Sequence, residues 1–155
     1  MDSLRMLYKI GFGPSSSHTM GPQKATLRFL ERTKDLPVEK YIVELYGSLA
    51  KTGKGHLTDW IILKTLGENK TQVMFKPEIE YEYHANGMKF FAYDKTSQEL
   101  DSYLVFSVGG GEIKELNESR KSSNNIYKLG SMNEILNWCE TSNKKIHEYV
   151  EFVEG

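Results

Sequence analysis

Three of the four histidines lie in short segments rich in glycine, serine or other turn-forming residues, and such histidines suit proton transfer. An imidazole changes charge near neutral pH, so it can accept or donate a proton. Glycines allow backbone turns that other residues resist, which helps to present a side chain at a surface. The segments therefore predict an acid/base site if the fold brings them together. They are residues 13–21 with His18, residues 47–59 with His56, and residues 84–88 with His84.

The segment around His18 also predicts an anion-binding turn. Hydroxyl groups and backbone N–H groups lie just ahead of a predicted helix, whose N-terminus carries partial positive charge that suits a carboxylate or a phosphate. Helix capping is the more common reason for a run of serines, but capping does not require His18. The candidate binding residues are Ser15, Ser16, Ser17 and Thr19.

His56 is a candidate general base near a predicted helix start. One ring nitrogen can accept a substrate proton while the other is held by Asp59 or by a backbone carbonyl. The alternatives are a solvent-facing histidine in a turn that Asp59 caps, or half of a metal site that lacks a third ligand. For His84 and Asn86 the plain alternative is a strand-connecting turn, because Asn-Gly is a favoured turn sequence.

Composition limits the class of protein. The chain has 155 residues, 39% of them hydrophobic and 26% charged, with a net charge of −1. These values predict one globular domain over residues 1–155. Basic and acidic residues are interspersed, so no clustered basic surface for nucleic acid is expected. No apolar run is long enough to span a membrane. A lone cysteine, Cys139, excludes an internal disulfide and an all-cysteine metal cluster. We expect a cytoplasmic protein.

Apolar periodicity and turn residues predict the elements that must hold these segments. Together they predict an α+β fold in which helices pack on a mixed or antiparallel sheet. Thr58 or Asp59 is the expected cap of the third helix, residues 84–87 the turn between two strands, and residues 119–125 a polar loop. The expected helices cover residues 4–8, 21–34, 60–66, 132–139 after a Ser131 cap, and 146–153; the expected strands cover 41–46, 79–83, 89–93 and 103–108.

Four motifs, in this order, resemble the β domain of bacterial iron–sulfur-dependent L-serine dehydratase. The resemblance runs from about Leu4 to Gly111. The motifs are Gly13-Pro14-Ser15-Ser16-Ser17-His18-Thr19-Met20-Gly21-Pro22, Gly47-Ser48-Leu49-Ala50-Lys51-Thr52-Gly53-Lys54-Gly55-His56-Leu57-Thr58-Asp59, His84-Ala85-Asn86-Gly87-Met88 and Ser107-Val108-Gly109-Gly110-Gly111.

The resemblance implies an enzyme that converts L-serine to pyruvate and ammonia. It implies a [4Fe–4S] cluster carried by a separate catalytic α domain or subunit, with iron as the Lewis acid, so the present chain alone should be inactive. It also implies a fold like the substrate-binding regulatory domain of some phosphoglycerate dehydrogenases, and we expect a homodimer. A serine-sensing regulatory module or a dimerisation module without catalysis are the alternatives.

The resemblance also implies roles for individual residues. His56 falls on the family's Gly-His-x-Thr-Asp histidine and would remove the α-proton. His18 would help to hold the substrate or the closed site, and His84 with Asn86 would orient the substrate or the base. The remaining candidate substrate-binding residues are Ser15, Ser16, Ser17, Thr19, Thr58 and Asp59, and no residue of this chain is expected to ligate a metal.

Overall fold

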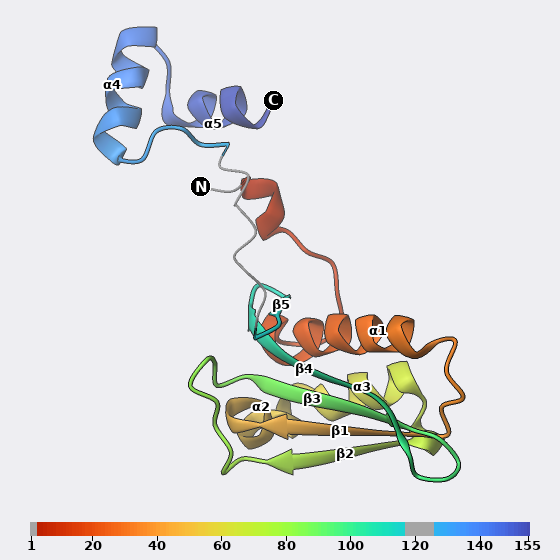
Figure 1. Ribbon diagram of the computed structural model, residues 1–155. Helices are drawn as coiled ribbons and strands as arrows, with labels where there is room; N and C mark the ends of the chain where they lie inside the picture. Colours follow the sequence, from red (N-terminus) through yellow and green to blue (C-terminus); the bar gives the residue numbers. More distant parts are fainter. Residues whose placement is uncertain (1–2, 117–125) are drawn as a thin grey trace. The chain divides into compact units, whose positions relative to one another are not determined.

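The computed structural model describes residues 3–116 and 126–155 and groups the chain into two compact units (Figure 1). The larger unit is Gly11–Glu118, and the smaller unit combines Met1–Ile10 with Ser119–Gly155. The single serine dehydratase β domain expected over residues 1–155 stays a prediction, and the polar loop expected over residues 119–125 lies outside the described residues.

The larger unit contains a five-stranded mixed sheet with the strand order β2-β1-β3-β4-β5. β1 and β2 pair in parallel, with Val43 opposite Val73. The other neighbouring strands pair antiparallel, with Val43 also opposite Phe90 across β1 and β3. The strands are β1 (Lys40–Tyr46), β2 (Thr71–Lys76), β3 (Gly87–Tyr93), β4 (Glu99–Gly109) and β5 (Glu112–Lys114).

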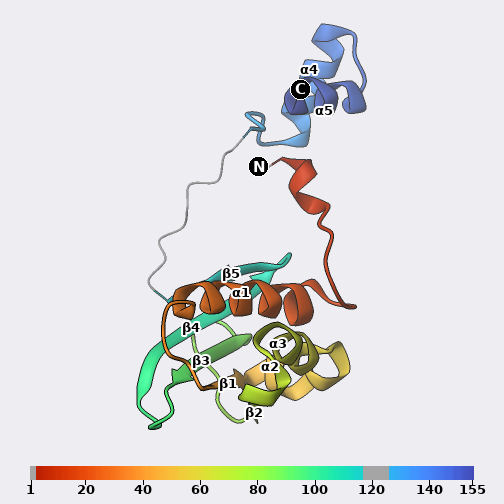
Figure 2. The ribbon, with the colours of Figure 1, turned by 90° about the vertical axis from the view of Figure 1, so that its right-hand side faces the viewer.

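Three helices of the larger unit cover one face of this sheet (Figure 2). Alternate residues of each central strand point into this layer, so Val43 and Leu45 of β1 are fully buried while Glu44 between them is only half-buried. Phe29 is also fully buried, and its ring lies against the ring of Phe90 from β3 at a centroid distance of 5.4 Å. The helices are α1 (Gly21–Thr33), α2 (Gly47–Thr52) and α3 (Thr58–Leu66).

The structure confirms most of the predicted elements of this unit. The helix expected over residues 21–34 is α1, and the strands expected over 41–46, 89–93 and 103–108 are β1, β3 and β4. The α+β class with a mixed sheet is therefore confirmed. Pro22 occupies the first turn of α1, where its missing N–H has no helical partner to lose.

Two predicted features of the sheet are wrong. The strand expected over residues 79–83 is absent, since only an isolated bridge joins Tyr81 to His84, and residues 84–87 do not connect two paired strands. The parallel edge strand β2 was not predicted. The alternation of buried and exposed residues along β2 is weak, and no residue of β2 is fully buried. Val73 and Phe75 are nevertheless more buried than Gln72 and Met74.

The cap predicted for α3 is also wrong. Leu57 stands at the N-cap in a left-handed conformation with φ of 60°, and no side chain caps the helix there. Thr58 is already inside the helix and its hydroxyl bonds elsewhere. Asp59 accepts a hydrogen bond from the backbone N–H of Trp60 at 2.9 Å. α3 ends at its C-cap, Gly67, which has φ of 98°.

The smaller unit contains the helices α4 (Met132–Ser142) and α5 (Ile146–Glu154), both predicted. The residues of the expected first helix form only one 3₁₀ turn, Leu4–Leu7. Ser131 caps α4 as predicted and forms a reciprocal capping box with Glu134. The carboxylate of Glu154 accepts hydrogen bonds from the backbone N–H of Leu4 and from the hydroxyl of Tyr127, which joins the two ends of this unit. None of the helices within residues 3–116 and 126–155 is long and apolar enough to cross a bilayer.

Candidate functional site

A π-helical turn, Ser16–Met20, directly precedes α1 and carries His18. The turn forms because Ser15 adopts an extended conformation and its hydroxyl accepts a hydrogen bond from the backbone N–H of His18 at 3.2 Å. The His18 ring is held at both nitrogens. Nδ1 lies 2.9 Å from the Ser17 hydroxyl, and Nε2 lies 3.4 Å from the hydroxyl of Ser48 at the start of α2.

A short 3₁₀ turn, Lys54–His56, follows α2 and carries the second histidine. Nδ1 of His56 lies 3.0 Å from the backbone carbonyl of Thr52. Because a carbonyl oxygen can only accept, Nδ1 must carry the proton that is donated in this hydrogen bond. The neutral His56 ring therefore has its lone pair on Nε2, which has no other hydrogen-bond partner among the described residues. This arrangement suits a proton acceptor.

The rings of His18 and His56 lie beside one another, with their centroids 5.0 Å apart and their planes tilted by 44°. Partial burial lowers the pKa of His18 below its ordinary value of 6.5, and the nearby positive charge of protonated His56 lowers it further. His18 is therefore neutral at neutral pH. A proton that His56 accepts does not meet a second positive charge in this pair.

Two threonine hydroxyls connect the backbones of the two histidine segments. Thr19 donates to the carbonyl of His56 at 2.7 Å, and Thr58 donates to the carbonyl of His18. Both threonine side chains are fully buried. The two histidine segments are thus joined by hydrogen bonds that run in opposite directions between them.

The third predicted segment is tied to the same region by backbone hydrogen bonds. The carbonyl of Ala85 accepts from the backbone N–H of Ser48 at 3.0 Å. Gly47 permits this approach, because its φ is 48° and a Cβ there would lie 2.6 Å from the Ala85 carbonyl. The backbone N–H of Asn86 donates to His84 Nδ1 at 3.0 Å, and the Asn86 amide donates to the carbonyl of Ser107.

His84 and Asn86 thus belong to a loop that borders Ser48 and β4. Among the described residues no hydrogen bond or ring contact joins His84 to His18 or to His56. The structure therefore brings two of the three predicted histidines into contact and places the third in a neighbouring loop. The roles expected for His84 and Asn86 stay predictions.

Ser107 was not among the predicted site residues, although it begins one of the quoted motifs. Its side chain is fully buried, and its hydroxyl has no hydrogen-bond partner among the described residues. A Cβ at Gly21, the first residue of α1, would lie 2.1 Å from this hydroxyl. Ser48, which contacts the ring of His18, was likewise missed. Its place two residues beyond the end of β1, within one of the quoted motifs, is the signal that could have found it.

The predicted substrate-binding residues differ in how available their side chains are. Ser16 is exposed and Asp59 is half-buried. The hydroxyls of Ser15 and Ser17 bond within the π-helical turn, to the His18 N–H and the His18 ring. The hydroxyls of the buried Thr19 and Thr58 already bond to carbonyls, so in this conformation they do not face a ligand.

This chain does not offer the ligands that an iron–sulfur cluster needs. Such clusters are held by several cysteine thiolates, and Cys139 is the only cysteine and is buried on α4. Within residues 3–116 and 126–155, no three histidine, cysteine or acidic side chains are grouped to hold a metal ion. A cluster that serves the two histidines would have to be bound by another polypeptide or by another part of a longer chain.

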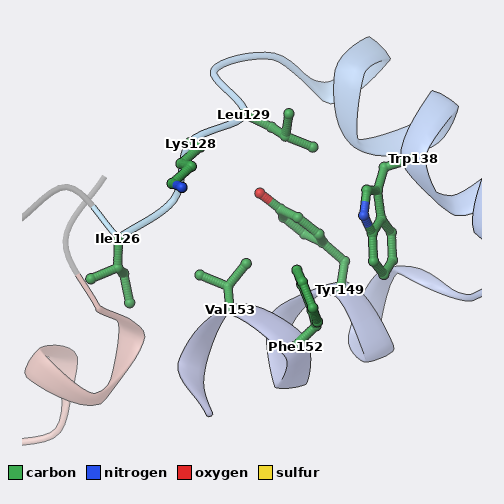
Figure 3. A pocket seen from close by; sticks show the side chains of 7 residues that line it. All are labelled: Ile126, Lys128, Leu129, Trp138, Tyr149, Phe152 and Val153. Carbon is green, nitrogen blue, oxygen red and sulfur yellow. The ribbon is translucent and has the colours of Figure 1, made fainter.

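A cavity of about 250 Å³ lies in the smaller unit, and Figure 3 shows its lining. Aromatic side chains from α4 and α5 form one wall, where the rings of Trp138 and Tyr149 lie 5.1 Å apart. Its lining includes the ammonium of Lys128 and the phenol of Tyr149 but no histidine or carboxylate, so it lacks the imidazole that the sequence predicts for the proton-transfer site. The lining residues are Ile126, Lys128, Leu129, Trp138, Tyr149, Phe152 and Val153.

The larger unit is thus an α+β domain that holds a pair of neighbouring histidines beside a helix N-terminus. Imidazoles can transfer protons and a helix N-terminus can bind an anion, so this arrangement suits an acid/base site for an anionic substrate. The family model of the serine dehydratase beta chain matches residues 3–73 and 64–118. The chain belongs to the serine dehydratase beta chain family.

Individual relatives agree with the family match. The L-serine dehydratase of Helicobacter pylori is 31% identical over 195 aligned residues, which take in 99% of this chain and 43% of that protein. L-serine dehydratase TdcG of Escherichia coli is 32% identical over 179 residues, which take in 86% of this chain and 39% of that protein. L-serine dehydratase 2 of the same species is 47% identical over 73 residues, 44% of this chain and 16% of that protein. The chain thus spans less than half the length of these relatives.

Proposed function

We propose that this chain is the β part of a cytoplasmic, iron–sulfur-dependent L-serine dehydratase and that it supplies the base that removes the α-proton of L-serine. The hydrogen bond from His56 Nδ1 to the Thr52 carbonyl carries this proposal, because it leaves the lone pair on Nε2. The family match and the L-serine dehydratases among the relatives support the choice of substrate.

The proposed reaction balances with this single base. Nε2 of His56 takes the proton from Cα of serine and then gives this proton to the departing β-hydroxyl, which leaves as water. The products are aminoacrylate and a neutral His56. Aminoacrylate tautomerises to an imine, and water hydrolyses the imine to pyruvate and ammonia. Throughout these steps Nδ1 of His56 keeps its hydrogen bond to Thr52, and His18 beside it stays neutral.

The partial positive charge at the N-terminal end of the π-helical turn and α1 supports binding of the serine carboxylate. Ser16, exposed in this turn, is the hydroxyl best placed to contact that carboxylate. The [4Fe–4S] cluster is proposed to reside on an α part that this chain does not include.

The proposal is tested by assembling this chain with a cluster-bearing α part and measuring pyruvate release from L-serine. We expect no turnover from the chain alone and a loss of about 10²- to 10⁴-fold in kcat for His56→Ala in the assembled enzyme. His147→Ala is the matched control, because His147 is exposed on α5 in the smaller unit, and it should keep full activity. Turnover by the chain alone, or near-normal turnover of His56→Ala, would contradict the proposal.

A calorimetric titration separates this proposal from a serine-sensing module. If the chain is half of a catalytic site, L-serine should bind to the isolated chain weakly or not at all. Binding in the micromolar range without any iron would favour the sensor.

A further inference from the structure

We propose that Thr19 and Thr58 form a reciprocal clasp that holds the His18 and His56 rings beside one another, and that they act as positioning residues and not as ligands of the substrate. The proposal concerns the same site, so its effect on turnover rests on the proposed function. Its geometric part is independent of any activity.

The clasp consists of two hydrogen bonds that cross between the histidine segments. Thr19 follows His18 in the chain and donates to the carbonyl of His56, at 2.7 Å. Thr58 lies just beyond His56 and donates to the carbonyl of His18. Each segment therefore supplies a donor to the other segment and accepts a donor from it, so a shift of either histidine backbone stretches both bonds.

Neither histidine lies within a long regular element that would fix it alone. His18 lies on a single π-helical turn and His56 on a 3₁₀ turn of three residues. Turns of these kinds have poor hydrogen-bond geometry and seldom extend beyond one turn. The contact between the rings therefore depends on bonds that connect the two turns, and the threonine hydroxyls provide them.

Burial shows that these hydroxyls are committed to the clasp. Both threonine side chains have 0% exposure, and a buried hydroxyl that already donates to a carbonyl cannot also donate to a ligand. Gly53 allows this packing, because a Cβ there would lie 2.2 Å from the Leu49 carbonyl and 3.3 Å from the Thr58 hydroxyl.

Thr26 on α1 provides a contrast and a matched control. It is also fully buried, but its hydroxyl donates to the carbonyl of Pro22, four residues earlier in the same helix, at 2.7 Å. Such local back-bonding is common for threonine in helices and connects nothing distant. Replacing Thr26 by valine removes a buried hydroxyl without touching the histidine pair.

The geometric test is NMR spectroscopy of the full chain. Wild-type protein should show nuclear Overhauser contacts between the ring protons of His18 and His56, since the ring centroids are 5.0 Å apart. Thr58→Val keeps the shape of the side chain but removes the hydroxyl, and it should lose these contacts. Thr58→Ser restores the hydroxyl and should restore the contacts, and Thr26→Val should leave them unchanged.

The functional test uses the assembled enzyme. A displaced base lowers the rate of the chemical step, so Thr58→Val should lower kcat by about 10- to 100-fold and change KM by less than about threefold. Thr58→Ser should return to within about threefold of wild-type kcat. If Thr58→Val does not fold, Thr19→Val carries the same two tests from the other side of the clasp.

Several outcomes would overturn the clasp. The first is retention of the ring contacts in a folded valine variant. The second is a rise in KM at unchanged kcat, which would indicate lost substrate contacts. The third is failure of both valine variants to fold, which would make the hydroxyls purely structural. Lost ring contacts combined with normal turnover of His56→Ala would leave the clasp standing and would instead contradict the proposed function.

Discussion

The His18 ring lies 5.0 Å from the His56 ring, centroid to centroid, although the two residues come from turns on opposite sides of β1 in the sequence. His18 is bounded by two serine hydroxyls, at 2.9 Å and 3.4 Å from its ring nitrogens. His56 is fixed through one nitrogen by the Thr52 carbonyl. One ring is thus held at both nitrogens, and the other keeps one nitrogen available for a proton.

The lowered pKa of His18 predicts a pH-dependent stability. Partial burial first, and the neighbouring His56 second, disfavour protonated His18 in the folded chain. Just below the ordinary value of 6.5 the unfolded chain therefore binds more protons at this residue than the folded chain. The contribution of His18 to the free energy of unfolding is present above that pH and is lost as the pH falls toward the lowered pKa.

Replacement of His18 by glutamine should weaken this pH dependence. Urea unfolding at about pH 7.5 and about pH 5.5, followed by the fluorescence of Trp60 in a Trp138→Phe background, should show a smaller difference between the two pH values for His18→Gln than for the parent. The same substitution at the exposed His147 should leave the difference unchanged. An equal pH dependence in the His18 variant and the parent would show that the His18 pKa is not lowered by folding.

Gly47 is expected to be indispensable at the junction of β1 and α2. Gly47→Ala should lower the free energy of unfolding by about 2–4 kcal/mol, because the left-handed conformation disfavours a Cβ and this Cβ would press on the Ala85 carbonyl. Gly55→Ala is the control within the same motif. A Cβ at Gly55 meets nothing within 4 Å, so this change should alter stability by less than about 1 kcal/mol. Equal effects in urea unfolding of the two variants would refute the argument.

Gly21 and Ser107 should show strong coupling in a double-mutant cycle. Gly21→Ala should lower stability by about 1–3 kcal/mol, because its Cβ would overlap the buried hydroxyl of Ser107. Ser107→Gly removes that hydroxyl and should relieve the overlap, so the double variant should be more stable than the sum of the single effects by about 1 kcal/mol or more. Strictly additive free energies of unfolding would show that the two residues do not press on each other.

The sequence predicted the central elements because their patterns were strong. Alternating buried residues in β3 and β4, and the Pro22 start of α1, follow directly from strand and helix rules. The edge strand β2 was missed because an edge strand buries little. Residues 79–83 were misassigned because their aromatic residues favour a strand, while Tyr81 packs against the rings of Tyr46 and Phe106 instead of joining the sheet.

The candidate site was predicted in its chemistry and only partly in its geometry. His18 and His56 were singled out from their segments, and the structure places them in contact. The hydrogen-bond partners of the two rings could not be predicted from the sequence, because they depend on how segments distant in the chain pack together. Ser48 reaches His18 only through the turn from β1 into α2, and the clasp of Thr19 and Thr58 requires both turns to fold against each other.

The most direct test of His56 as the base is chemical rescue of His56→Ala in the assembled enzyme. Free imidazole should raise the rate of pyruvate formation from L-serine in this variant by at least about tenfold, since a small base can enter the space that the ring leaves. It should not change the rate of the wild type or of His147→Ala. A His56→Ala enzyme that turns over L-serine at the wild-type rate without imidazole would contradict the account.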